Sequence, residues 1–252
     1  MKLIQLKTSL LSGIAVALLA AAPAHSQESP WAGQTFLPDY SKLQPAPGKE
    51  GKDYIYVSPN VEALASKYTK VMLDQPEIFI SADSPYKGAK PEDIAAIAAA
   101  IRSTTAAAFN ERGYSVVDTP GPDTLYIRVG VTDLSIKKKK RGLLSYTPVG
   151  IVVSTGANAL KDFMDKYDIL DMSLQAESQD SVSGEQIGAL VLQRGESADA
   201  TKPISFDALM AASNEYSERL ACRLDNTHVP ADQRIDCTDP ATRKARPKLV
   251  GQ

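Results

Sequence analysis

Three carboxylates lie close together in the stretch AESQDSVSGE, where Glu177, Asp180 and Glu185 surround the turn sequence SVSG. Paired carboxylates can perform general acid and base catalysis, in which one donates a proton while the other activates water. A carboxylate-dependent hydrolase is therefore one hypothesis for this chain. Carboxylates beside a turn are, however, ordinary solvated side chains. We therefore interpret these three as structural, and we predict no catalytic residue.

A second group that could do chemistry lies near the C-terminus. His228 lies between the two cysteines, Cys222 and Cys237, with Asp225 and Asp236 nearby. Two cysteines and one histidine without a standard spacing make a poor zinc site, and a Ser-His-Asp arrangement would need its histidine in a polar tail. The chain also contains no glycine-rich phosphate or dinucleotide motif. We predict no metal and no cofactor, and one disulfide between the cysteines in an oxidising compartment.

A basic run followed by an uncharged segment is the third feature. Residues 142–160 carry no charge, and the run before them comprises Lys137, Lys138, Lys139, Lys140 and Arg141. Lysines beside apolar residues can bind an anionic membrane surface, at about 1 kcal/mol for each lysine. Lysines at a strand end also block edge pairing, and a loop and a short helix would then follow. The second interpretation is the simpler one, and these five residues are the candidate surface-binding residues.

The first residues are typical of a secretory signal peptide. Lys2 and Lys7 accompany an apolar stretch, and Ala24 and Ser26 provide the small residues of a cleavage site. We expect a signal peptide over residues 1–26, cleavage after Ser26, and a periplasmic or secreted protein; a retained membrane anchor is the alternative. No cysteine lies near the cleavage site, so no lipid anchor is expected. Export and a net charge of −2 argue against nucleic acid as a partner.

The composition is that of a globular protein. Of 252 residues, 43% are hydrophobic and 23% are charged, so the chain can bury a core. Prolines and polar residues predict an extended N-terminal arm over residues 27–66. A single α+β domain should follow over residues 67–224, and a polar C-terminal tail over residues 225–252.

The middle of the chain has a clear helix signal. Pro91 suits the first helical turn, acidic residues follow it, and Gly113 ends the pattern. The stretch before this helix, Tyr68–Ile80, predicts a strand that is interrupted at Pro76. Because proline cannot donate to a ladder, this strand should lie at an edge or contain a bulge.

Two strands are predicted on either side of the turn sequence TPGPD. In the second, the odd-numbered residues from Leu125 to Val131 share one face, whereas Leu134 and Ile136 have the opposite parity. One extra residue at Thr132–Asp133 would bring all of them to one face, so we predict a β-bulge there. Such a bulge would re-aim the Asp133 carboxylate, although bulges are more often structural than catalytic.

The clearest strand is DILDMSLQAESQD, in which apolar and polar residues alternate, so that one face should be buried and the other wet. The turn SVSG and a return strand over Glu185–Arg194 complete a hairpin. A last helix is predicted over Phe206–Leu224, with Ser205 as its cap. Hairpins dominate this order, so we predict an α+β fold: a mostly antiparallel sheet of about five strands with two main helices packed on one face.

Four of these stretches resemble one protein family: FLPDYSKLQP, YTKVMLDQ, GYSVVDTPGPDTLYIRVGVTDL and AESQDSVSGEQIGALV. The family comprises proteobacterial envelope proteins with a domain of unknown function, number 3313, and many members look like lipoproteins. The resemblance implies an envelope location and an α+β fold, and it implies no reaction and no catalytic residues. This chain departs from the lipoprotein pattern because it lacks a lipid-accepting cysteine.

These observations predict a non-catalytic periplasmic or envelope-associated protein that binds a partner protein or an anionic membrane surface. Two alternatives remain open. One is the carboxylate-dependent hydrolase, and the other is an envelope assembly accessory that multimerises through a strand edge.

Overall fold

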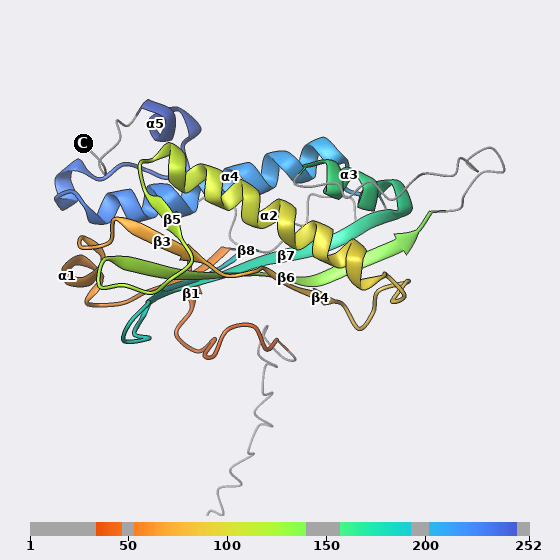
Figure 1. The fold of residues 1–252 in the computed structure, drawn as a ribbon, viewed down its shortest axis with the longest axis horizontal. Coiled ribbons are helices and arrows are strands. Elements are labelled where there is room, and N and C mark those ends of the chain that lie inside the picture. The colour runs from red at the N-terminus through yellow and green to blue at the C-terminus, as the bar shows by residue number, and fades with distance from the viewer. Residues whose placement is uncertain (1–33, 47–52, 140–156, 193–201, 246–252) are drawn as a thin grey trace, which may run out of the picture. The chain divides into compact units, whose positions relative to one another are not determined.

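A computed structural model describes residues 34–46, 53–139, 157–192 and 202–245, which belong to one compact unit (Figure 1). The strands are β1 (Gln44–Pro45), β2 (Asp53–Val57), β3 (Lys70–Leu73), β4 (Glu77–Ile80), β5 (Ser115–Val117), β6 (Thr124–Lys138), β7 (Tyr167–Asp180) and β8 (Gln186–Leu192). The helices are α1 (Val61–Ala65), α2 (Pro91–Glu111), α3 (Ala157–Lys166), α4 (Phe206–Thr227), the 3-10 helix η1 (Ala231–Gln233) and α5 (Pro240–Ala245).

The strands form one mixed sheet. Its order is β1-β2-β8-β7-β6-β3-β5, and β4 also pairs with β6. The neighbouring pairs β1–β2, β2–β8, β8–β7 and β7–β6 are antiparallel. Strand β3 is parallel to both β5 and β6, and β4 is parallel to β6. The predicted α+β class is confirmed. The prediction of a mostly antiparallel sheet of about five strands with two main helices was wrong, because the described residues contain eight strands and five α-helices.

The parallel pairs arise because α2 carries the chain across the sheet between β4 and β5. Parallel neighbours need a crossover of about a dozen or more residues, which this helix supplies. The two strands predicted beside TPGPD are present as β5 and β6, but β3 lies between them. The predicted strand Tyr68–Ile80 is divided around Pro76 into β3 and β4. Strand β3 is paired on both sides rather than lying at an edge, whereas β4 pairs with β6 and has a register shift between Ile78 and Ile80, as the predicted alternative of a bulge requires.

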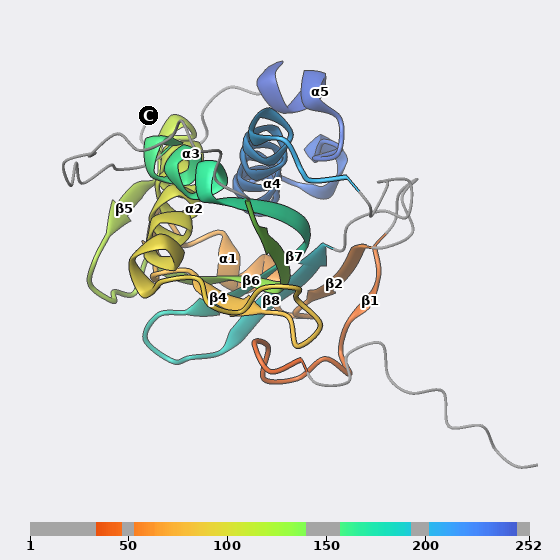
Figure 2. The same ribbon diagram turned by 90° about the vertical axis from the view of Figure 1, so that its right-hand side faces the viewer.

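Helices α2, α3 and α4 lie on one face of the sheet, as both ribbon views show (Figures 1 and 2). Helix α2 begins at Pro91 as predicted, and Gly113 follows its end with a φ of 93°, a conformation that favours glycine. The Ser205 hydroxyl caps α4 by accepting a hydrogen bond from the backbone N–H of Ala208 at 3.1 Å. Local signals therefore determine where these two long helices begin or end.

A β-bulge interrupts β6 at the predicted position. The register between β6 and β7 shifts between Thr132 and Ser135, and Asp133 has a φ of 54°. The extra residue changes the parity of the strand, so Leu134 and Ile136 are buried like the odd-numbered residues before the bulge. The predicted bulge is confirmed.

Residues 34–43, here called the strap, cover the sheet face opposite the long helices (Figure 1). Gln175 and Glu177, which the alternation in β7 had predicted on a wet face, are each 1% exposed. Strap residues hydrogen-bond to Gln175, and the arginine that pairs with Glu177, Arg128, lies over the Phe36 ring of the strap. The prediction that these residues share one face of β7 was correct. The prediction that this face is exposed to solvent was wrong, because a segment distant in sequence covers it. Part of the region expected as an extended arm also forms β2, which pairs with β8.

Polar side chains attach the strap to the bulge. The Gln34 amide donates to both carboxylate oxygens of Asp133 at 2.9 Å. The Gln175 amide donates to Gln34 Oε1 at 2.9 Å, and the Tyr40 hydroxyl donates to Gln175 Oε1 at 2.8 Å. The bulge therefore directs the Asp133 carboxylate toward the strap, where its role is to hold the strap in place.

Gly130→Ala is expected to loosen the strap. A Cβ at this position would lie 2.6 Å from Cδ2 of Phe36, so the ring would have to move. We expect urea unfolding to show a loss of about 1–3 kcal/mol. The same substitution should cost much less in a Phe36→Ala background, where the ring is absent. Equal costs in the two backgrounds would contradict this contact.

Candidate functional site

An apolar cavity of about 310 Å³ lies between the sheet and α4. Strands β2, β6, β7 and β8 form its floor, α4 and one residue of α2 form its roof, and α1 forms a side wall. Most side chains that line it are aliphatic or aromatic: Ile55, Val57, Val61, Ala65, Phe109, Leu125, Ile127, Ala176, Ile187, Leu190, Leu220 and Leu224.

Small residues leave this space open. Ala176 lies in the middle of the floor, where its partners on the neighbouring strands are Val129 and Leu190. Ala65 contributes only a methyl group from α1, and Gly188 contributes no side chain from β8. Protein interiors are normally filled to a density that leaves few voids larger than a water molecule. The cavity is therefore a feature of the fold rather than ordinary loose packing.

The exposed residues of the lining mark where the cavity meets solvent. Val57 is 50% exposed there. Beside it, Arg234 donates a hydrogen bond to Glu62 at 2.7 Å, and both of these side chains are exposed. An apolar hollow with a polar rim is the usual form of a small-molecule site.

Arg223 is a partly buried cation in the cavity wall. Within the described part of the chain it forms no hydrogen bond or ion pair, whereas the rim carboxylate of Glu62 is bound by Arg234. Burial lowers the pKa of the Arg223 guanidinium, and attraction to Asp53 acts in the opposite direction. The guanidinium of Arg223 could therefore bind a negatively charged group of a ligand in the cavity.

The carboxylates considered for acid–base catalysis do not converge. Glu177 is the cross-strand partner of Arg128, whose Nη1 donates to it at 3.1 Å on the strap face. Asp180 is the partner of Leu125, a core residue, so its carboxylate lies on the helix face. Both are buried, which corrects the expectation of solvated turn residues, whereas Glu185 is exposed. The three therefore do not form one site.

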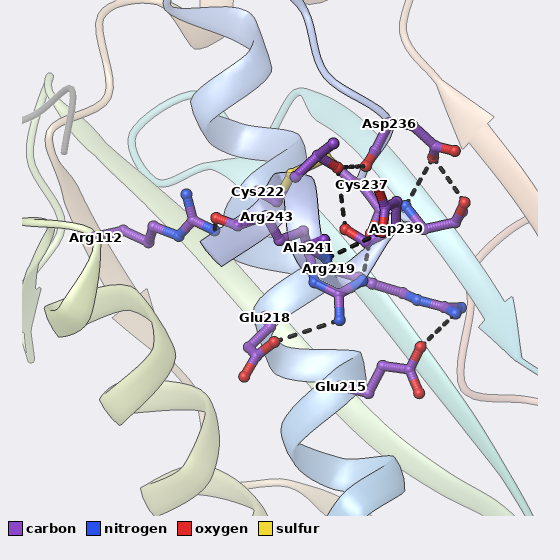
Figure 3. A network of polar contacts seen from close by, with 12 residues as sticks. Arg112, Glu215, Glu218, Arg219, Cys222, Asp236, Cys237, Asp239, Ala241 and Arg243 are labelled. Atoms are coloured by element: carbon purple, nitrogen blue, oxygen red, sulfur yellow. Dashed lines mark hydrogen bonds and ion pairs between the residues drawn. A yellow bond between two sulfur atoms is a disulfide. The ribbon is translucent and has the colours of Figure 1, made fainter. Parts of the chain in front are cut away.

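The predicted disulfide between Cys222 and Cys237 is present, with an S–S distance of 2.03 Å. It joins α4 to the segment after η1, and Figure 3 shows the polar network around it. Arg243 of α5 donates to the Cys237 carbonyl oxygen at 2.8 Å and pairs with Glu218 of α4 at 3.3 Å. The C-terminal region thus stabilises the helix that covers the cavity.

His228 is packed at the end of α4 rather than placed for catalysis. Its ring lies 6.0 Å from that of Tyr114, and its buried Nε2 has no hydrogen-bond partner among the described residues. Burial lowers the pKa of the His228 imidazole, so its neutral form is favoured. Across the described ranges, no cluster of three or more histidine, cysteine or acidic residues is suited to a metal ion.

The basic run is described only in part: Lys137, Lys138 and Lys139 are exposed at the end of β6, and Lys140 and Arg141 lie outside the described residues. Lys138 Nζ lies 5.5 Å from the ring centroid of Tyr86. Lys139 donates to the Met164 carbonyl oxygen at the end of α3. Two of these lysines therefore help to fix the strand end, and binding of a membrane surface stays a prediction.

Comparison with models of protein families shows which family the chain belongs to. The model of a family described as "Protein of unknown function (DUF3313)" matches residues 33–220. The chain belongs to the DUF3313 family. The resemblance inferred from the sequence is thus confirmed. The match includes every strand of the sheet but ends before Arg223 and both cysteines.

Two solved structures are similar to this DUF3313 chain at low TM-scores. A PelC dodecamer from Paraburkholderia phytofirmans has 10% identity and a TM-score of 0.31, covering 64% of this chain and 95% of that one. A DUF4136 family protein from Bacteroides thetaiotaomicron has 14% identity and a TM-score of 0.37, covering 70% and 98%. Such scores carry no argument about fold or function. A comparison with curated proteins gives no match.

Sequence reasoning did not find the cavity of this DUF3313 protein. Leu220 and Leu224 were predicted only as part of a helix, and nothing in the sequence distinguishes Arg223 from other helical arginines. The one available signal is Ala176, a small residue that follows Met172 and Leu174 at the inward positions of β7. No helix in the described ranges is both long and apolar enough to cross a bilayer.

Proposed function

We propose that this DUF3313 protein is a non-catalytic, envelope-associated binding protein that holds an apolar ligand between the sheet and α4. The observation that carries the proposal is the cavity of about 310 Å³. This volume lies within the range of roughly 300–1,000 Å³ that is typical of ligand sites. Its apolar lining and the exposed Val57 at its opening favour an apolar molecule over a polar one.

The envelope location is supported by the signal-like N-terminus and by the disulfide, which suits an oxidising compartment. The partners expected from the sequence, an envelope protein or an anionic membrane surface, are compatible with a ligand in the cavity. The described lysines of the basic run lie outside its lining. Flotation with anionic vesicles, with and without these lysines, would test the membrane surface separately.

Ala176→Leu is expected to weaken ligand binding, because the larger side chain would occupy the floor of the cavity. N-phenyl-1-naphthylamine, an uncharged dye that fluoresces in apolar sites, is a suitable probe. The wild-type protein should bind it saturably, and the variant should bind it about tenfold more weakly or worse. Thermal unfolding of both proteins would show that the variant is folded.

Ala99→Leu is the matched control, since Ala99 is an exposed residue of α2 outside the cavity lining. Its affinity for the dye should equal that of the wild type. A wild-type protein without saturable binding would overturn the proposed function. Unchanged affinity in folded Ala176→Leu would place the dye elsewhere and would overturn it as well.

A further inference from the structure

Arg223 distinguishes the cavity from a purely apolar hollow. It lies in the wall beside Leu220 and Leu224 of α4, and its guanidinium has no hydrogen-bond or ion-pair partner in the described part of the chain. The side chain is partly buried, and a cation that is partly removed from water without a partner carries an unfavourable desolvation cost. The planar guanidinium fork matches the oxygens of a carboxylate or a phosphate. The position therefore suits a negatively charged oxygen from a ligand.

Two further hydrogen-bond donors near Arg223 lack acceptors among the described residues. They are the hydroxyl of Tyr216, which is 3% exposed, and Nε of Arg219. Residues 216, 219 and 223 follow one another at three- and four-residue spacings, so they share one side of α4. Both neighbours act electrostatically on Arg223. Neither residue lines the cavity, and the Arg219 guanidinium also pairs with Glu215, so Arg223 is the cation of this side of α4 that a ligand in the cavity meets.

We propose that the ligand is a single-chain amphiphile with an anionic head, whose chain lies in the cavity and whose carboxylate or phosphate oxygens bind the Arg223 guanidinium. This inference rests on the proposed function and names its ligand class. The aliphatic lining matches a hydrocarbon chain. A volume of about 310 Å³, at the small end of ligand sites, matches one chain rather than two.

Displacement of N-phenyl-1-naphthylamine at neutral pH tests the head group. The competitors share a ten-carbon chain and differ in their heads: decanoate, decyl phosphate, decan-1-ol and decylammonium. For the wild-type protein we expect an anionic competitor to bind about tenfold or more tightly than decan-1-ol, and decylammonium to bind most weakly. The tighter of decanoate and decyl phosphate assigns the head as carboxylate or phosphate.

Arg223→Met is the decisive variant, because it keeps an unbranched side chain and removes the charge. It should lose the preference for anions, measured as the ratio of the decanoate affinity to the decan-1-ol affinity within the same variant, and it should fold well because it removes an unpaired, partly buried cation. Arg223→Lys should keep part of the preference. Arg102→Met on α2, outside the cavity lining, is the matched control and should behave as the wild type.

The possible outcomes separate the two proposals. If no competitor and no dye binds, the proposed function fails. If decan-1-ol and decanoate bind equally well to the wild type, or if Arg223→Met keeps the anion preference, the cavity still binds ligands but the head-group inference is overturned.

Discussion

Replacing Asp225 by alanine is expected to lower the free energy of unfolding by about 3–5 kcal/mol. The carboxylate is 0% exposed and accepts hydrogen bonds from Arg112 Nη1 at 2.9 Å and from the Tyr114 hydroxyl at 3.0 Å. Without it, the Arg112 side chain, which is 13% exposed, would keep its charge in a nearly buried place. The loss should appear as a lower urea midpoint with an unchanged slope.

The double variant with Arg112→Met separates the cost of a lone charge from the cost of lost packing. Removing both partners leaves no uncompensated cation, so the double variant should be more stable than Asp225→Ala alone. Tyr114→Phe should cost only about 1 kcal/mol, because it removes one hydrogen bond. A loss of less than about 1 kcal/mol in Asp225→Ala would show that this carboxylate does not hold the end of α4.

Features that depend on neighbouring residues were predictable. The bulge follows from the parity change between Val131 and Leu134, and α2 follows from Pro91 and Gly113 at its ends. The sheet order was not predictable in this way, because alternation shows that a strand has two faces and does not show which strand lies beside it. The insertion of β3 between β5 and β6 depends on contacts between distant segments.

Burial and the cavity depended on such distant contacts too. Gln175 has the alternation of a wet position, yet it is buried and hydrogen-bonded to Gln34 and Tyr40 of the strap. The small residues that line the cavity, Ala65, Ala176 and Gly188, come from three separate elements, and none of them is unusual in its own stretch of sequence. The site could therefore be recognised only from the arrangement of the elements in space.

Asp180 is the second buried carboxylate whose loss should have a large effect. Its oxygens accept hydrogen bonds from the Tyr68 hydroxyl at 2.8 Å and from the backbone N–H groups of Val182 and Ser183, and Lys67 Nζ lies 2.7 Å away. Burial alone would raise the pKa of Asp180, but the hydrogen bonds from Lys67, Ser183 and Tyr68 outweigh it and hold the pKa well below its ordinary value. The carboxylate therefore stabilises the fold in its charged form.

Stability should consequently depend on Asp180 at neutral pH and much less in acid. Its pKa in the unfolded chain is about 3.9, so the unfolded state takes up the proton first; the contribution is fully present above about pH 4 and is lost progressively as the pH falls from there toward the much lower pKa of the folded state. Asp180→Asn should cost about 2–4 kcal/mol at pH 7, and the stability difference between variant and wild type should shrink progressively as the pH falls below about 4. Asp118→Asn, at a carboxylate that is 90% exposed, should follow the wild type throughout. Parallel stability profiles for Asp180→Asn and the wild type would show that the charge of Asp180 does not stabilise the fold.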